Sequence, residues 1–194
     1  MELIFATSNK GKLREASEIL GEGYRLLCPA DLGITEEIPE TGDTLEANSL
    51  QKARYVFEKC GRDCFADDTG LEVDTLGGAP GVHSARYATD GHDFEANIDK
   101  LLAELEKHPG EPRTARFRCV VTLIHKGETH TFEGKVEGRI ATERRGNEGF
   151  GYDSVFIPDE LDGSTFGEVH EGKNLISHRG RSLRALARWL KENG

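Results

Sequence analysis

The stretch that decides the fold is LIFATSNKGKLREASEIL, residues 3–20. Its apolar run at residues 3–6 predicts a buried strand, and the small polar residues at 7–9 end that strand. Apolar side chains then recur at helical spacing up to Leu20, and Gly21 ends the pattern. Because the chain opens as strand, polar turn and helix, we expect an α/β protein.

Strands and helices continue to alternate along the rest of the chain. The patterns predict further strands at 25–28, 64–66, 117–123 and 130–140. One helix is expected to begin at a capping box that starts at Asp43 and to end near Gly61. Two more helices are expected, at 94–105 and after Ser177. Lys126-Gly127-Glu128 is expected to be the turn of a hairpin. The 194 residues are enough for one domain, 1–194, with its own hydrophobic core.

The composition argues against several classes of protein. The formal net charge is −10, whereas a general nucleic-acid binder carries a basic face, so we expect no nucleic-acid partner. No apolar run approaches the ~20 residues of a membrane span, so we expect no membrane partner.

The four cysteines lack the paired spacing of a zinc site, and the first residues lack a signal peptide. We therefore expect reduced thiols and a cytoplasmic protein.

The polar turn TSNKGK, residues 7–12, is the first candidate binding element. It lies where a strand ends and a helix begins, and the free N–H groups at a helix start attract anions. Its hydroxyls, its amide and its two lysines add further donors for a polyphosphate. The turn does not match the common Gly-rich phosphate loop, and a well-capped helix start with surface lysines is the alternative interpretation.

Asp67 and Asp68 form the second candidate element, at the end of an expected strand. Adjacent acids point in different directions, so one can bind Mg²⁺ while the other supports it. The sequence Asp-Asp-Thr-Gly is equally typical of a turn. The acidic loop at 36–43 becomes relevant only if it folds back near Asp68, because an isolated acidic cluster is more often a solvated surface.

Two further elements carry aromatic or basic side chains. In GFGYD, residues 149–153, two aromatic residues between glycines can stack on a base, and Asp153 can accept hydrogen bonds from a purine ring. A hydrophobic loop packed on the core is the alternative.

Lys173 and the Ser177-His178-Arg179 segment place cations near an expected helix start. No nucleophile elbow accompanies the serine and histidine, so we do not expect covalent catalysis.

Taken together, these segments resemble the inosine/xanthosine triphosphate pyrophosphatase family over essentially the whole chain. Six blocks in the same order carry the resemblance, and any one of them alone is weak. The blocks are ATSNKGK at 6–12; ETG at 40–42 with Asn48 and Lys52-Ala53; ADDTGL at 66–71; GGAPG at 77–81 with SARY at 84–87; GFGYD at 149–153; and KN at 173–174 followed by SHR at 177–179. Ser154 and His83 depart from the family pattern, in which proline and tyrosine are common there, but neither is assigned chemistry.

The resemblance implies a role for each matching position. Asp68 matches the proton acceptor, Glu40 and Asp68 match the residues that hold Mg²⁺, and Lys52 matches a position that faces the phosphates. The implied substrate-binding residues are Thr7, Ser8, Asn9, Lys10, Gly11 and Lys12 for the triphosphate; Thr69 for a further substrate contact; Phe150, Gly151, Tyr152 and Asp153 around base and sugar; and Lys173, His178 and Arg179 for base recognition.

The same resemblance implies the fold and the reaction. We expect a long twisted mixed sheet flanked by helices, in two lobes with the nucleotide site in the cleft between them, and a homodimer. The expected reaction is Mg²⁺-dependent hydrolysis of the non-standard purine nucleoside triphosphates ITP, dITP and XTP at the α-phosphorus. It yields a nucleoside monophosphate and pyrophosphate and cleanses the nucleotide pool. An ordinary aspartate has a pKa of ~3.9, so we expect positioning and charge stabilisation to supply most of the rate.

The choice of base follows from donors and acceptors. Hypoxanthine and xanthine carry a 6-keto acceptor that His178 or Arg179 can satisfy, whereas adenine carries a donor there.

One rival function is that of a pyrophosphatase for pyrimidine or modified nucleotides, in which the block at 177–179 is not expected. A second rival is a nucleotide-sensing module that binds without turnover, which the acidic set Glu40, Asp67 and Asp68 disfavours.

Overall fold

The computed structural model describes the whole chain, Met1–Gly194, and its internal contacts group into two compact units. The first unit comprises residues 1–68, 119–134 and 178–194, and the second comprises 69–118 and 135–177. The strands that contribute residues to both units are β3 (Cys64–Val73), β5 (Thr114–His125) and β6 (Glu128–Ile140). None of the helices has the length and apolar character needed to cross a membrane.

Seven strands form one mixed sheet in the order β2-β1-β3-β5-β6-β7, with β4 paired to β3. β1 (Glu2–Phe5) runs parallel to β2 (Arg25–Leu27) and to β3. β4 (Pro80–Gly81) is antiparallel to β3, and β7 (Phe156–Pro158) is antiparallel to β6. The structure confirms the mixed sheet of an α/β protein. The single domain 1–194 and the nucleotide cleft stay predictions.

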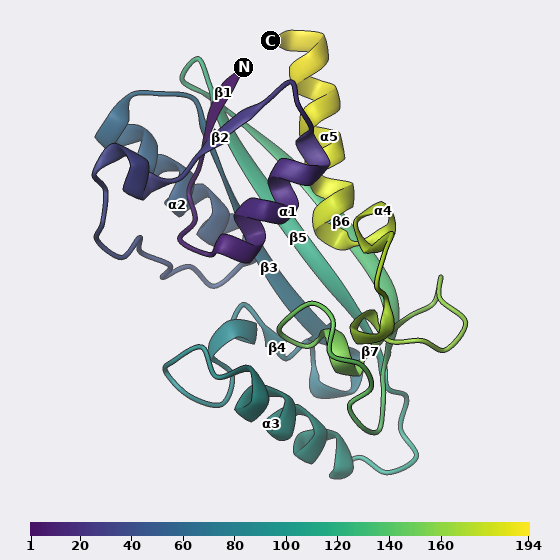
Figure 1. The fold of residues 1–194 in the computed structure, drawn as a ribbon. Coiled ribbons are helices and arrows are strands. Elements are labelled where there is room, and N and C mark those ends of the chain that lie inside the picture. Colours follow the sequence, from purple (N-terminus) through teal and green to yellow (C-terminus); the bar gives the residue numbers. More distant parts are fainter. The chain divides into compact units, whose positions relative to one another are not determined.

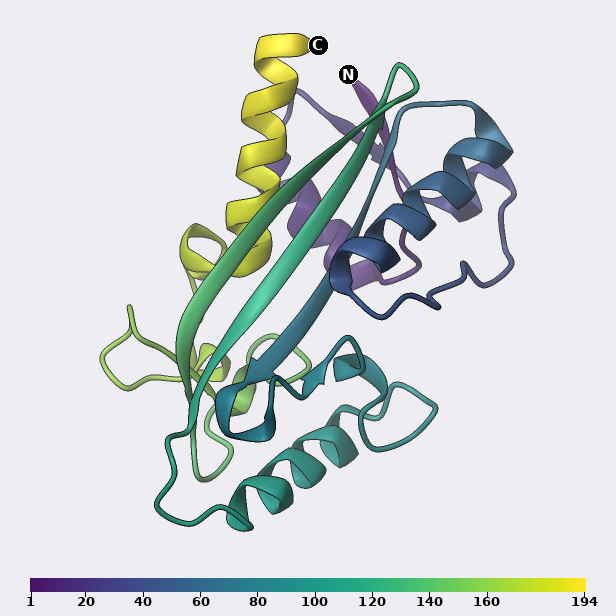
Figure 2. The ribbon, with the colours of Figure 1, turned by 180° about the vertical axis from the view of Figure 1, so that it is seen from behind.

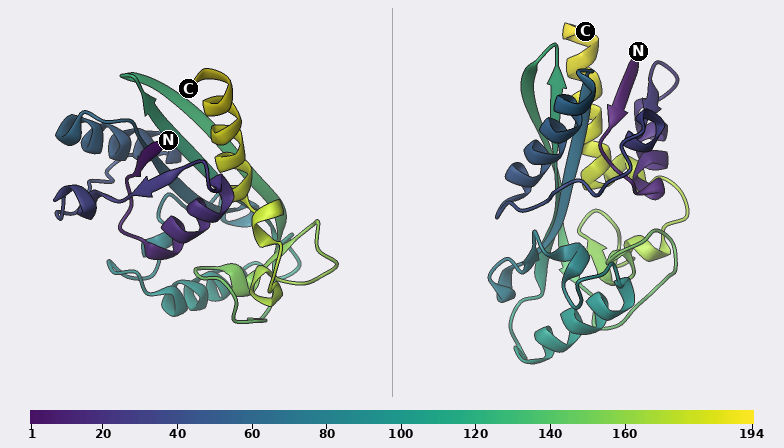
Figure 3. Two further views of the ribbon diagram at one scale, coloured as in Figure 1. Left: turned by 45° about the horizontal axis from the view of Figure 1, so that its top comes forward. Right: turned by 90° about the vertical axis from the view of Figure 1, so that its left-hand side faces the viewer.

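The first unit places helices on both faces of its strands. Its helices are α1 (Lys10–Leu20), α2 (Leu45–Cys60) and α5 (His178–Asn193). Because side chains alternate along β1, Leu3 and Phe5 join the core shared with α1 and α5, whereas Ile4 joins the core shared with α2. Figures 1 and 2, which view opposite sides, show α1 beside α5 on one face and α2 on the other. The right-hand view of Figure 3 shows the same layers from the side.

Capping residues determine where these helices begin and end. The side chain of Asn9 accepts a hydrogen bond from the Lys12 backbone N–H at 3.1 Å and starts α1. The hydroxyl of Thr44 accepts one from the Ala47 N–H at 3.0 Å and starts α2, so the prediction that Asp43 is the cap is wrong by one residue. The α2 helix ends at Gly61, whose φ of 63° lies in the left-handed region that glycine tolerates.

The main departure from the sequence analysis is β3. The sequence places a turn at Asp67 and Asp68, with Leu71 and Val73 as a possible continuation of the strand, whereas the structure runs β3 without a turn through to Val73. Turn propensity is overridden because the residues on either side are buried: Ala66 lies in the core shared with α2, and Leu71 lies in the core of the second unit. Both carboxylates are therefore held inside the protein and not on a surface turn.

The second unit is built on its own core. Its helices are α3 (Phe94–Glu106) and the short α4 (Lys173–Ile176). One face of α3, including Ile98 and Leu101, packs in a core with Phe156 and Phe166. The predicted amphipathic helix at 94–105 is confirmed, and its capping residue is Asp93, whose carboxylate accepts from the Ala96 N–H at 3.0 Å.

Candidate functional site

The predicted phosphate-binding turn lies between β1 and α1, as the sequence indicates. Thr7 and Asn9 stabilise the turn itself: the Thr7 hydroxyl accepts from the Asn9 N–H at 3.1 Å, and Asn9 caps α1. Ser8 and Lys10 are exposed and remain accessible to a ligand. The structure therefore confirms the capped helix start, and the contact with phosphate stays a prediction.

Asp67 lies at the centre of a buried network of charges in the first unit. One of its carboxylate oxygens accepts from the Lys12 ammonium at 3.1 Å, and the other accepts from Arg179 Nε at 3.3 Å. Arg179 also pairs with Glu15. Burial alone raises the pKa of Asp67, but Lys12, Arg179 and Lys52 hold it well below its usual range. Burial disfavours the charged form of Arg179, but Asp67 and Glu15 outweigh this effect and raise the pKa of Arg179.

Asp68 belongs to a second group of charges in the same unit, around Lys52 of α2. The Lys52 ammonium lies 2.5 Å from Glu40 Oε1 and 3.9 Å from Asp68 Oδ1. Lys52 is buried, yet its pKa is raised, because Asp67, Glu40 and Asp68 together outweigh the cost of burying the charge. The acidic loop thus folds back beside Asp68, as a shared metal site of these carboxylates would require.

The two neighbouring aspartates differ in basicity. Burial raises the pKa of Asp68 to about 6, although Lys52 and Lys12 act in the opposite direction. The nearby carboxylates of Glu40 and Asp67 add to the increase. Asp68 is therefore a stronger base than the ordinary aspartate assumed from the sequence, and Asp67 is a weaker one.

The carboxylates of Glu40 and Asp68 are the residues of this unit that fit a divalent cation. Both approach the Lys52 ammonium, so both face one small region. Mg²⁺ binds through one or two carboxylates when substrate phosphates and waters supply its other oxygens. No group of three or more His, Cys, Asp or Glu side chains is arranged to hold a metal. Two carboxylates are too few donors for a metal held by protein alone, so a divalent cation here would take its other ligands from waters or a bound anion.

The GFGYD segment lies in the second unit, where Asp153 holds it together. The Asp153 carboxylate accepts from the Phe150 backbone N–H at 3.1 Å and from the Lys173 ammonium at 2.7 Å. Lys173 also lies 5.4 Å from the centre of the Phe150 ring. Gly149 is required here, because its φ is 71° and a Cβ would lie 2.1 Å from Asp153 Oδ2. Phe150 and Lys173, which the sequence assigns to base recognition, are therefore brought together by Asp153.

The second aromatic residue of this segment has a different environment. Tyr152 is buried in the core of the second unit, and its hydroxyl donates to the Ser84 carbonyl at 2.6 Å. Its ring thus matches the alternative interpretation, a hydrophobic loop packed on the core, whereas Phe150 is only half-buried. Contacts of Thr69, Gly151 and Tyr152 with substrate stay predictions.

His178 is the first residue of α5, and it is positioned by a close approach of this helix to β6. A Cβ at Gly134 would lie 2.1 Å from the His178 carbonyl oxygen and 2.6 Å from the Ser182 nitrogen. Only glycine at 134 allows the first turn of α5, which carries His178 and Arg179, to lie here. His178 is buried, and its contact with a base stays a prediction.

Two residues that shape the site are not predicted from the sequence. Glu15 pairs with Arg179 and lies one helical turn after Lys12. Its spacing from Lys12, a predicted phosphate ligand, places it on the same side of the helix and is the signal that indicates it. Gln51 binds the loop that carries Glu40, and no local pattern marks it.

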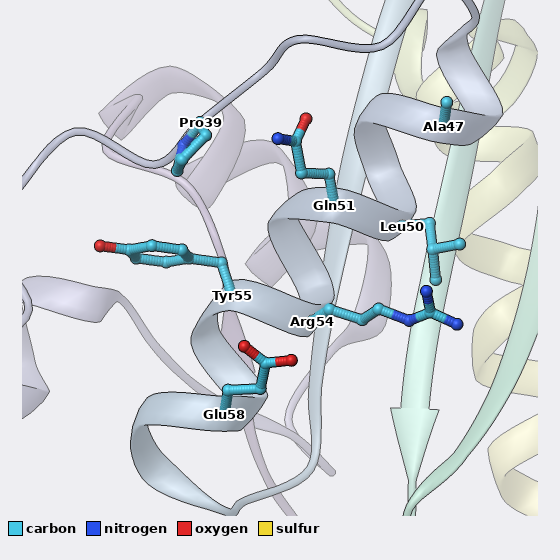
Figure 4. Close-up of a pocket in the computed structure, with 7 residues that line it drawn as sticks. All are labelled: Pro39, Ala47, Leu50, Gln51, Arg54, Tyr55 and Glu58. Carbon is cyan, nitrogen blue, oxygen red and sulfur yellow. The ribbon is translucent and has the colours of Figure 1, made fainter.

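A pocket of about 390 Å³ lies along the solvent side of α2, and Figure 4 shows the side chains around it. It is lined by Pro39, Ala47, Leu50, Gln51, Arg54, Tyr55 and Glu58. None of the predicted substrate or metal residues lines this pocket. The pocket and Lys52 lie on different sides of α2, because Arg54 and Glu58 are exposed whereas Lys52 is buried.

Comparisons with known proteins cover nearly the whole chain. A model of the Ham1 family matches residues 3–189. The dITP/XTP pyrophosphatase of Porphyromonas gingivalis is 50% identical over 97% of this chain and 97% of its own, and that of Christiangramia forsetii is 48% identical over 99% and 100%. The solved structure of a HAM1 protein from Coxiella burnetii matches with a TM-score of 0.91 at 36% identity and covers 99% of each chain. These matches confirm the family resemblance and the fold class.

Proposed function

Because the chain belongs to the Ham1 family, we propose that it hydrolyses the non-standard purine nucleoside triphosphates ITP, dITP and XTP to the monophosphate and pyrophosphate. Its relatives named dITP/XTP pyrophosphatase align over nearly their full length and support this substrate class. The observation that carries the proposal is the buried Lys52, which approaches both Glu40 and Asp68. Two carboxylates and a buried ammonium suit a phosphate-anhydride substrate that brings its own cation.

The proposed reaction is attack of water on the α-phosphorus, with cleavage of the bond to the oxygen that bridges to the β-phosphorus. Asp68 accepts the proton of the water, a role that fits its buried carboxylate, which lies 3.9 Å from the Lys52 ammonium. Glu40 and Asp68 would hold Mg²⁺, which when bound neutralises charge on the phosphate oxygens. The departing pyrophosphate carries away the electron pair of the broken bond.

The lysines of the first unit are proposed to stabilise the charge of the pyrophosphate. Lys12 is held by Asp67 at 3.1 Å and Lys52 by Glu40 at 2.5 Å, so both ammonium groups are oriented before a substrate arrives. Oriented charges of this kind need no rearrangement during the reaction, which is how they lower a barrier. Lys10 is exposed and adds a more mobile charge.

Base recognition is proposed to use Phe150 for stacking and Lys173 and His178 as donors to the 6-keto group. Arg179, which the sequence also assigns to base recognition, is buried between Asp67 and Glu15, so we propose that it supports Asp67. Lys173 is the donor with the clearest support, because Asp153 holds its ammonium near the Phe150 ring. We also propose, from the family resemblance, that the protein is a homodimer. From its four free cysteines we propose that it works in a reducing cytoplasm.

Turnover with product identification tests this function. With Mg²⁺, the protein should release pyrophosphate from ITP, dITP and XTP far faster than from ATP, and chelation of the metal should stop the reaction. Asp68→Asn should lower kcat by at least ~100-fold, the lower end of a general-base contribution, whereas the exposed Asp43→Asn should leave it unchanged. Orthophosphate as the product, or near-normal turnover by Asp68→Asn, would contradict the assignment.

A further inference from the structure

The loop at 36–44 carries Glu40 and lies along α2, which binds it at several points. At its start, Glu36 accepts from the Tyr55 hydroxyl at 2.9 Å and pairs with the Lys59 ammonium at 2.5 Å. At its end, Thr44 caps α2. Between these points Glu40 has an exposed position, yet its carboxylate reaches the buried Lys52. The ion pair with Lys52 holds the carboxylate itself, whereas the exposed backbone at Glu40 needs contacts of its own.

The contacts directly after Glu40 come from one side chain, Gln51. Its Oε1 accepts from the Thr41 backbone N–H at 2.8 Å, and its Nε2 donates to the Thr41 hydroxyl at 3.0 Å. One amide thus holds both the backbone N–H and the hydroxyl of the residue next to Glu40. Figure 4 shows Gln51 reaching from α2 toward the segment that carries Pro39, which precedes Glu40.

The next residue is held just as closely. The Gly42 N–H donates to Asn48 Oδ1 at 2.7 Å. A Cβ at Gly42 would lie 2.7 Å from the Ala47 Cβ, so the loop backbone lies directly on the helix. Helical spacing separates Asn48, Gln51 and Lys52 in α2. This one helix therefore both positions the loop backbone and contacts the Glu40 carboxylate.

We propose that Gln51, assisted by Asn48, is a positioning residue for the carboxylate of Glu40. Gln51 does not touch substrate or metal; it fixes the backbone from which Glu40 extends. The inference rests on the proposed function, in which Glu40 holds Mg²⁺. Groups that orient a metal ligand typically change metal affinity or activity by 10–100-fold when they are removed.

Gln51→Met tests this proposal, because it keeps the length of the side chain and removes both hydrogen bonds. Binding of the non-hydrolysable α,β-imido analogue of ITP is measured by calorimetry with and without Mg²⁺. We expect Gln51→Met to lose about tenfold of the affinity gained with Mg²⁺ and to bind the metal-free analogue as the wild type does. Hydrogen exchange of the Thr41 amide should become faster, and half-maximal turnover should require about tenfold more Mg²⁺.

Two further variants separate positioning from general damage to α2. Gln51→Glu should protect the Thr41 amide from hydrogen exchange as the wild type does, because its two oxygens can accept from the N–H and the hydroxyl of Thr41. Arg54→Met makes a similar change one turn further along the pocket and should alter none of these measurements. A Gln51→Met protein with the full Mg²⁺-dependent gain in affinity would overturn the positioning role alone. A wild type that gains no affinity from Mg²⁺ would overturn the proposed metal role, and this inference with it.

Discussion

Asp67→Asn is the substitution that most directly tests the buried charge network of the first unit. The change keeps the size of the side chain and an acceptor oxygen but removes the negative charge between Lys12 and Arg179. Asp67 is 1% exposed and Arg179 3%, so water cannot replace the lost partner. We expect the free energy of unfolding to fall.

The size of the loss follows from the geometry. Two unit charges 3.1–3.3 Å apart attract each other by about 5 kcal/mol at an effective dielectric constant of 20. Relief from desolvating Asp67 offsets part of this, and breaking a buried pair from one side costs about 3–5 kcal/mol. Glu15 still neutralises Arg179, and Lys12 is partly hydrated, so we expect the lower end, about 3 kcal/mol.

Urea denaturation measures this loss, provided that the transition is two-state. For a chain of this length, about 3 kcal/mol also lowers Tm by about 6–12 °C. The matched control is Asp43→Asn, the same change at an exposed position, which should stay within about 0.5 kcal/mol of wild type. If Asp67→Asn unfolded with less than about 1 kcal/mol of loss, Asp67 would not be holding the two cations, and the argument for a pre-oriented Lys12 would fail.

Three further predictions concern other parts of the chain. Gly134→Ala should destabilise by about 1–3 kcal/mol in urea denaturation, because its Cβ would meet the His178 carbonyl, whereas Gly23→Ala, with open space around it, should not. Tyr152→Phe should cost about 1 kcal/mol at pH 8 through its lost hydrogen bond. Because burial raises the pKa of Tyr152, the tyrosine contributes its stability below pH ~10 and loses it above, so unfolding measured at pH 11 should show a smaller difference between the two proteins. Burial raises the pKa of Cys64 to about 12, so native-state alkylation at pH 8, followed by mass spectrometry, should leave this thiol unmodified; rapid labelling would contradict its burial.

Local sequence was most informative where a structural feature depends on neighbouring residues. The junction of β1 and α1 is of this kind, because Asn9 caps the helix through a residue only three positions away. The turn at Lys126-Gly127 and the amphipathic α3 follow from the same short-range logic. The cap of α2 shows the limit of such reasoning, because Asp43 and Thr44 are both good capping residues and only the backbone conformation selects Thr44.

The Asp67-Asp68 pair shows what local sequence left open. Asp-Asp-Thr-Gly suits a turn, but its neighbours in β3 are buried in two cores, and that burial keeps the strand extended. The GFGYD segment is similar. Its residues suit either a base or a core, and the structure places Tyr152 in the core and leaves Phe150 half-buried.

By itself, then, the sequence determined the alternation of strands and helices, the ends of the longer helices to within about one residue and, through its ordered motifs, the family. Only the tertiary structure decided which charges meet: Lys12 and Arg179 at Asp67, and Lys52 between Glu40 and Asp68. The physical reason is that periodicity and capping act over a few residues, whereas these ion pairs join positions up to 112 residues apart. They form only once strand register and helix packing have brought the elements together, and burial then sets the basicity of each carboxylate.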